Sequence, residues 1–136
     1  MTTTTGQAQV TAPEQIHATF AEAVNRRDLE RLVGLFEDDA VVIAPAGEQG
    51  AGERRDGIDA IRAHLQRLLA MQPHMTIVAS RGHRNGDLAL LSSHWRSTVT
   101  TPEGGQAEIE GRGAELARRQ PDGTWRLVID NPGGAG

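Results

Sequence analysis

The sequence of 136 residues contains no cysteine and no tyrosine, and all 14 of its basic residues are arginine. Without cysteine there can be no disulfide, thiol catalysis or cysteine-bound metal. Without lysine, Schiff-base chemistry and a lysine-dependent phosphate loop are excluded. The formal net charge of −4 argues against a nucleic-acid partner, because such proteins usually carry a basic patch.

Long apolar runs are also missing. The longest, at residues 40–46 and 88–91, are far shorter than the roughly 20 residues needed to cross a membrane, so we expect no membrane segment. Residues 1–10 lack the basic and apolar regions of a signal peptide, which predicts a cytoplasmic protein. The length fits one domain, which we place at residues 12–132, between a disordered tail at 1–11 and a flexible tail at 133–136.

Apolar residues at helical spacing predict three helices in the first half of the chain. The first spans residues 13–25. The second follows Asp28 and includes Leu29, Leu32, Val33 and Phe36 as one stripe. A short strand at 40–44 comes next, and a third helix starts at Asp56 and ends before Pro73.

The second half predicts four strands at 74–84, 87–101, 106–119 and 124–130. Asn85-Gly86 is a strong hairpin signal, because both residues tolerate the positive φ of a tight turn. Helices followed by an antiparallel meander indicate an α+β domain with the helices on one face of the sheet.

The pattern resembles the nuclear-transport-factor-2-like superfamily, and within it the SnoaL-like and ketosteroid-isomerase-like bacterial branch. The residues that carry the resemblance run in order along the chain: Phe20, Asn25, Asp28, Leu32, Phe36, Asp38-Asp39-Ala40-Val41, Pro45, Gly47, Gly57, Ile61, Asp122-Gly123-Thr124-Trp125-Arg126 and Asp130-Asn131-Pro132. The resemblance implies a cystatin-like fold, in which a cone-shaped barrel of curved antiparallel sheet wraps the three helices around an apolar pocket. It also implies a homodimer through the outer face of the sheet.

The same resemblance places the catalytic groups of ketosteroid isomerase on this chain. That enzyme combines an aspartate base with an oxyanion hole made by a tyrosine and a protonated aspartic acid. The tyrosine position falls on Phe20 and the base position on Ala44, and neither residue can exchange a proton. The acid position falls on Glu115. Steroid isomerisation by that mechanism is therefore not expected.

Glu115 is nevertheless the first candidate for acid–base chemistry, since a carboxyl group in an apolar pocket has a raised pKa. Carrying the register from the Asn85-Gly86 turn puts Ser92, His94 and Arg96 on the inward face, where His94 would pair with Glu115. The alternatives are a solvated Glu115 on the outer face and a His94 that only packs.

The register of the last strand stays open. Burial favours Trp125, Leu127 and Ile129 inside, whereas the family register turns Val128 and Asp130 inward. A bulge would reconcile the two, and so would a dimer that buries an outer face containing Leu91, Trp95, Leu116, Trp125 and Leu127. Asp130 would then either enter the pocket beside Arg96 or cap the Asn131-Pro132 turn.

These arguments give one set of site residues: Glu115, His94 and Asp130 for catalysis, and Phe20, Ala44, Ser92, Arg96, Gly113 and Val128 for substrate binding. No histidine pair has the i, i+4 spacing of a helical zinc site, so we expect neither a metal nor a cofactor. We expect a small hydrophobic molecule as partner. The sequence leaves open whether the domain catalyses isomerisation, dehydration or cyclisation of that molecule, or binds it without chemistry.

Overall fold

The computed structural model describes residues 9–44 and 53–134, and all structural statements below concern these residues. The first part of the chain forms a 3-10 turn at Pro13–Gln15 and the helices α1 (Ile16–Asn25) and α2 (Leu29–Val33). Asp28 caps α2 through its side chain, which accepts a hydrogen bond from the Arg31 amide at 3.0 Å. The first two predicted helices and the capping role of Asp28 are thus confirmed.

Phe36, predicted to extend the second helix, instead begins the strand β1 (Phe36–Ile43). The helix stops at Val33, and Phe36 pairs with Leu127 of the last strand. Pairing with a distant strand therefore overrides the helical spacing of the apolar residues. The third helix, α3 (Ile58–Ala70), starts two residues later than predicted, because Asp56 belongs to a short strand, β2 (Arg54–Asp56).

The second half forms the long strands β3 (His74–Asn85), β4 (Leu88–Thr100) and β5 (Gln106–Arg119), followed by β6 (Trp125–Asn131). All four agree closely with the strands predicted from the sequence. The tight turn between β3 and β4 lies at Gly86-Asp87, with Gly86 at φ 62°, one residue beyond the predicted pair.

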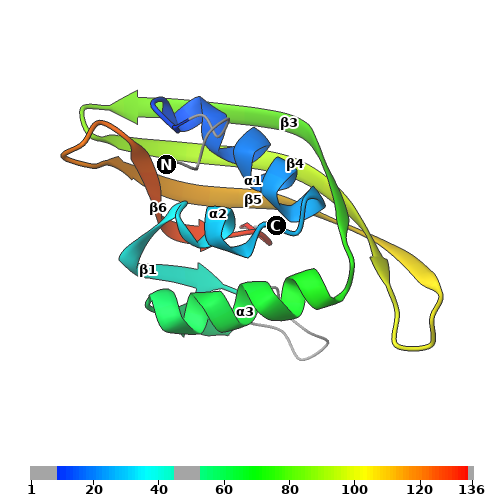
Figure 1. Cartoon of the computed structure of the whole chain (residues 1–136). Coiled ribbons are helices and arrows are strands. Elements are labelled where there is room, and N and C mark those ends of the chain that lie inside the picture. The colour runs from blue at the N-terminus through cyan, green and yellow to red at the C-terminus, as the bar shows by residue number, and fades with distance from the viewer. Residues whose placement is uncertain (1–8, 45–52, 135–136) are drawn as a thin grey trace.

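These six strands form one sheet in the order β2-β1-β6-β5-β4-β3, and the helices lie on its inner, concave face (Figure 1). This confirms the α+β architecture of a curved sheet around three helices. Two details differ from the expectation. The described sheet is open, with β2 and β3 at its edges, and β1 pairs with β6 in parallel rather than antiparallel.

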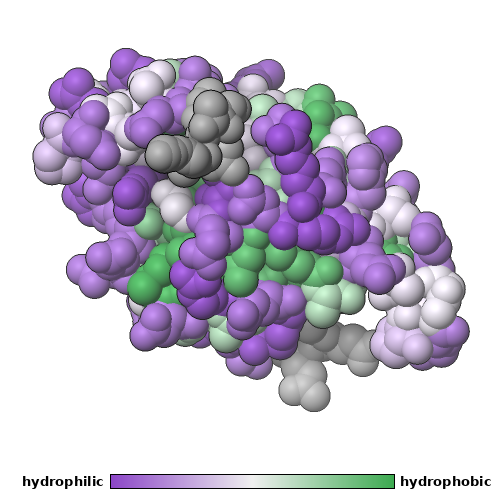
Figure 2. Space-filling view, in the orientation of Figure 1, coloured by the Kyte–Doolittle hydropathy of each residue, from purple (hydrophilic) through white to green (hydrophobic). Residues whose placement is uncertain are grey.

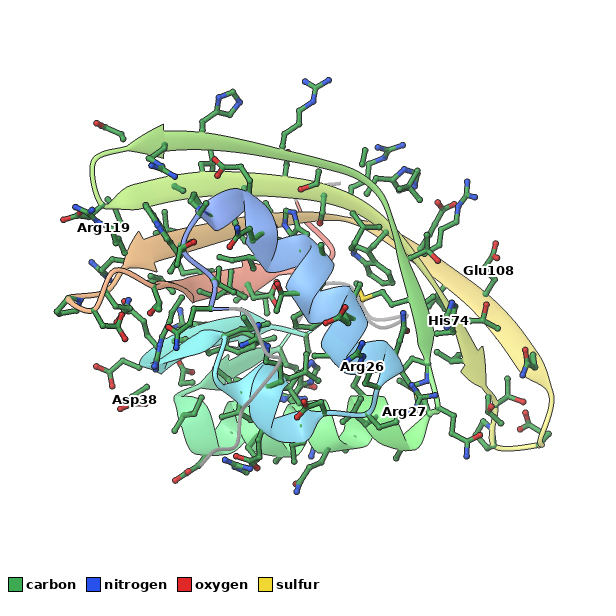
Figure 3. The ribbon with its side chains drawn as sticks, turned by 45° about the horizontal axis from the view of Figure 1, so that its top comes forward. Arg26, Arg27, Asp38, His74, Glu108 and Arg119 are labelled. Atoms are coloured by element: carbon green, nitrogen blue, oxygen red, sulfur yellow. The ribbon has the colours of Figure 1, made fainter. Side chains whose placement is uncertain are left out.

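The hydrophobic core fills the space between the helices and the sheet. Its largest members are almost fully buried: Ile16, Leu32, Phe36, Ile61, Leu65, Leu91 and Leu127. Asn25 joins the end of α1 to the start of β3, because its side chain donates to the Met75 carbonyl and accepts from the Met75 amide. Charged side chains such as Asp38, Glu108 and Arg119 point away from this space (Figure 3).

Leu91, Trp125 and Leu127 belong to this core, so the expectation that they form an outer dimer face is wrong. In the orientation of Figure 1 the surface is largely hydrophilic, with an apolar band across the region between α2 and α3 (Figure 2). Val10, in the segment predicted as a tail, is buried, and its carbonyl accepts a hydrogen bond from the Trp125 amide at 2.9 Å. Residues 1–8, Pro45 and Gly47 lie outside the described residues. None of the described helices has the length and apolar character needed to cross a membrane.

Candidate active site

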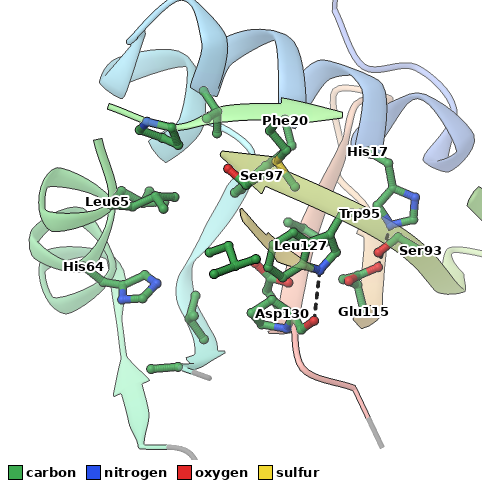
Figure 4. A pocket seen from close by; sticks show the side chains of 18 of the residues that line it. His17, Phe20, His64, Leu65, Ser93, Trp95, Ser97, Glu115, Leu127 and Asp130 are labelled. Carbon is green, nitrogen blue, oxygen red and sulfur yellow. Dashed lines mark hydrogen bonds and ion pairs between the residues drawn. The ribbon is translucent and has the colours of Figure 1, made fainter. Parts of the chain in front are cut away.

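A cavity of about 360 Å³ lies between α1, α3 and the inner face of the sheet (Figure 4). Most of its wall is apolar and comes from every layer of the fold, including Phe20 of α1, Leu65 of α3, Trp95 of β4 and Leu127 of β6. A few polar side chains interrupt this wall. An apolar cavity with few convergent polar groups is the usual form of a small-molecule site.

A buried histidine–carboxylate pair occupies one side of the cavity. Nε2 of His17, on α1, lies 2.5 Å from Oε1 of Glu115, on β5, and the two side chains are only 8% and 5% exposed. Nδ1 of His17 lies 2.6 Å from the hydroxyl oxygen of Ser80, on β3. When Nε2 donates its hydrogen bond to the Glu115 carboxylate, Nδ1 of the neutral imidazole accepts a hydrogen bond from the Ser80 hydroxyl group. The chain Ser80–His17–Glu115 therefore fixes the ring and orients the Glu115 carboxylate at the cavity wall.

Gly113 makes room for the Glu115 carboxylate. A Cβ atom at position 113 would lie 2.3 Å from Oε2 of Glu115 and 2.7 Å from the hydroxyl oxygen of Ser93, which is closer than a real Cβ atom tolerates. The glycine predicted to bind substrate therefore shapes the site from behind the carboxylate.

Asp130 is the second carboxyl group of the site. It stands opposite Glu115 across the β5–β6 pair, and both residues line the cavity. Asp130 is partly exposed to the cavity but surrounded by protein. Burial, and next the negative charge of Glu115, raise the pKa of Asp130 to about 8. Asp130 is thus mainly protonated at neutral pH and can donate a proton.

A β-bulge places Asp130 inside. Leu116 pairs with Ile129, but Ala117 pairs with Leu127, so Val128 is the extra residue on β6. Trp125 and Leu127 therefore face the core before the bulge, and Asp130 faces the cavity after it. This bulge resolves the conflict between burial and the family register. It leaves Val128 outside the cavity lining, contrary to its predicted role.

His64 and two arginines lie on the opposite side of the cavity. Figure 4 shows His64 projecting from α3, across the space from His17 and Glu115. Arg55 of β2 and Arg67 of α3 also line the cavity. Burial, followed by the charges of Arg55 and Arg67, lowers the pKa of His64, so its neutral form is favoured.

Four of the predicted site residues line the cavity: Phe20, Ala44, Glu115 and Asp130. The inward placement of Ser92, His94 and Arg96 is wrong. Nε2 of His94 lies 2.7 Å from Oε2 of Glu110, an exposed residue, and Nε of Arg96 lies 3.6 Å from the same oxygen. The expected pair of His94 with Glu115 is replaced by His17 with Glu115.

The faces of β4 are reversed as a whole. Its side chains alternate without a break from Leu88 to Thr100, with the odd-numbered residues inside and the even-numbered ones, including His94, outside. The β3–β4 register shifts between Ile77 and Ala79, but the extra residue, Val78, belongs to β3, so this bulge leaves the faces of β4 unchanged.

Sequence reasoning missed His17, Ser80, His64 and Arg55. His17 lies beside the apolar stripe of its helix, and no spacing pattern links it to a glutamate 98 residues further along the chain. Among residues 9–44 and 53–134, no group of three or more histidine, aspartate or glutamate side chains is placed to hold a metal ion.

Comparison with known proteins agrees with this architecture. The model of the SnoaL-like domain family matches residues 17–128. A search of curated proteins found no match. Among solved structures, a nuclear transport factor 2-like superfamily protein from Salmonella enterica superposes with a TM-score of 0.71 at 17% identity, with 90% of each chain covered.

Two further solved structures share the fold. A ketosteroid isomerase-like protein from Erwinia carotovora gives a TM-score of 0.71 at 18% identity, covering 87% of this chain and 89% of the other. An NTF2-like protein with a cystatin-like fold from Novosphingobium aromaticivorans gives 0.69 at 18% identity, covering 87% and 76%. At these identities the likeness shows the fold alone. With the family model spanning most of its length, the chain belongs to the SnoaL-like domain family.

Proposed function

We propose that this SnoaL-like domain catalyses proton transfer on a small hydrophobic molecule, in an isomerisation, dehydration or cyclisation. The observation that carries the proposal is the pairing of two unlike carboxyl groups in one apolar cavity. Glu115 is fixed by His17, whereas Asp130 has a pKa of about 8. Two carboxyl groups held in different surroundings within one cavity are a usual arrangement of a general base and a general acid.

The roles follow from the contacts. The Glu115 carboxylate removes a proton from a carbon of the substrate, and His17, which contacts Oε1, is the positioning residue that orients the carboxylate. Protonated Asp130 donates to the oxygen that gains negative charge, or to the departing hydroxyl in a dehydration. This assignment differs from ketosteroid isomerase, since Phe20 and Ala44 line the cavity without a polar group.

A second candidate function is ligand binding without chemistry. The apolar side chains at Phe20 and Ala44 favour it, because a scaffold that has lost two catalytic groups can still hold a ligand. Catalysis requires Glu115 and Asp130 to transfer protons, whereas binding without chemistry does not.

The Kemp elimination of 5-nitrobenzisoxazole tests the first candidate. A base removes the ring C–H proton, the N–O bond breaks, and a nitrile and a coloured phenolate form, so absorbance reports a base in an apolar pocket. We expect turnover above that of buffer, with a loss of about a hundredfold in Glu115→Gln. The matched control is Glu110→Gln, an exposed carboxylate on the same strand, which should keep full turnover. A rate equal to that of buffer, or an unaffected Glu115→Gln variant, would favour ligand binding.

We also propose that the protein forms a homodimer through the outer face of the sheet. Leu90, Leu116 and Ile129 lie in register across β4, β5 and β6, and Leu90 and Ile129 are 59% and 40% exposed. An apolar row of this kind on a sheet face is typical of an interaction surface. Light scattering should give twice the 14.6 kDa chain mass, reverting to the chain mass in Leu90→Glu. A wild-type protein that is monomeric at high concentration would contradict this expectation.

A further inference from the structure

Two buried polar atoms of the described residues have no hydrogen-bond partner, and both belong to side chains that line the cavity. They are Nε of Arg55 and the hydroxyl oxygen of Ser97. Buried polar groups in native proteins are nearly always paired, so an orphan needs an explanation. Because the two side chains line a ligand-sized cavity, a molecule bound against them would provide the missing partners.

Leaving Nε of Arg55 unpaired costs more free energy than leaving the Ser97 hydroxyl unpaired, because the guanidinium keeps its charge at any physiological pH. Its Nη1 donates to Oε2 of Glu53 at 3.0 Å and, at 3.4 Å, to the backbone carbonyl of Arg54. These contacts hold the outer end of the guanidinium and leave the buried Nε–H for another acceptor. An unpaired donor on a charged group costs more than one on a neutral group.

The two sides of the cavity differ in charge. Glu115 and Asp130 occupy one side, and Arg55 and Arg67 contribute positive charge beside His64 on the other. Burial, and then the charges of Arg55 and Arg67, lower the pKa of His64. A ligand that pairs with Arg55 and Arg67 carries an anionic oxygen. The apolar wall between the two sides of the cavity requires that the rest of the ligand be hydrophobic.

We propose that the ligand of this cavity is a hydrophobic carboxylic acid, whose carboxylate accepts from Nε of Arg55 while its apolar rings extend toward Glu115 and Asp130. The inference deepens the proposed function and rests on the same cavity. It assigns Arg55 to substrate recognition. Ser97, only 6% exposed, provides a neutral hydrogen-bonding group for a second polar substituent along the ring system.

Isothermal titration calorimetry with 2-naphthoate and its neutral isostere 2-naphthamide tests the proposal. The two probes share the same fused rings and differ in charge. We expect the wild-type protein to bind the acid about tenfold more tightly than the amide, a difference of roughly 1.4 kcal/mol. Arg55→Gln should abolish this preference by weakening the acid alone. The matched control is Arg54→Gln, its exposed neighbour on β2 that pairs with Asp56, which should keep the preference.

The wild-type comparison needs no variant, so the test stands even if Arg55→Gln does not fold. Equal affinity for the two probes, or no binding of the acid, would overturn the proposal. The result is independent of catalysis, because Glu115→Gln should keep the acid preference while losing Kemp turnover. A protein that prefers the acid but shows no turnover in any form would refute the proposed chemistry and leave the ligand class standing.

Discussion

Replacing Asp130 with asparagine gives a direct test of the electrostatics in the cavity. Burial and the charge of Glu115 raise the pKa of the Asp130 carboxyl group from 3.8 to about 8. The asparagine amide has nearly the shape of the protonated acid but cannot ionise. Between these two pH values the unfolded carboxyl group has lost its proton and the folded one keeps it. The stability that depends on Asp130 is therefore full below about pH 4 and is lost as the pH rises toward 8.

The magnitude follows from the single proton involved. One proton bound only by the folded state changes the free energy of unfolding by about 1.4 kcal/mol for each pH unit. Asp130→Asn is free of this loss, so its stability relative to the wild-type protein should rise with pH. Its advantage should grow by about 3 kcal/mol between pH 5 and pH 7. Urea unfolding followed by circular dichroism at each pH measures the difference.

The control for this experiment is Asp122→Asn. Asp122 is exposed in a turn, and hydrogen bonds from Thr124 lower the pKa of its carboxyl group. Its replacement should give no advantage that grows with pH, since a lowered pKa has the opposite linkage. The reasoning about Asp130 is refuted if the stability margin of Asp130→Asn is constant with pH, or if carbon NMR shows the Asp130 carboxyl group titrating near 4.

Three further outcomes are expected. Glu115→Gln removes the charge that repels an ionised Asp130, so NMR titration should show a lower pKa for Asp130; an unchanged value would mean that burial alone raises it. Gly113→Ala should displace the Glu115 carboxylate, with a loss of Kemp turnover and about 1 kcal/mol in thermal unfolding; unchanged turnover would contradict the close approach. Asn25→Ala leaves two peptide groups at the start of β3 without partners, and urea unfolding should show a loss of about 2 kcal/mol, whereas a neutral effect would show that water replaces the side chain.

Much of the fold could be predicted from local signals. The β-branched run and the glycine turn located β3 and β4, and β5 was predicted with its observed bounds, Gln106–Arg119. The order of signature residues pointed to the SnoaL-like family, which the family model confirms over residues 17–128. These features depend on the spacing of neighbouring residues, which the sequence displays directly.

The faces of β4 and β6 could not be predicted, because a shift of one residue exchanges the two faces of a strand. The β3–β4 turn lies one residue beyond the predicted pair, and the unbroken alternation of β4 leaves His94 outside. In β6, one extra residue at Val128 turns Asp130 toward the cavity. A bulge reverses every side chain beyond it, yet the local sequence carries no clear sign of where it occurs.

The sequence by itself therefore determined the elements, the family and the candidacy of Glu115. Only the tertiary structure decided its partner, since His17, a helix residue 98 positions away, meets Glu115 on one side of the cavity. The unpaired Nε of Arg55 and the raised pKa of Asp130 likewise exist only in the folded chain. Burial and the approach of distant charges create both properties, and neither is encoded in the spacing of neighbours along the chain.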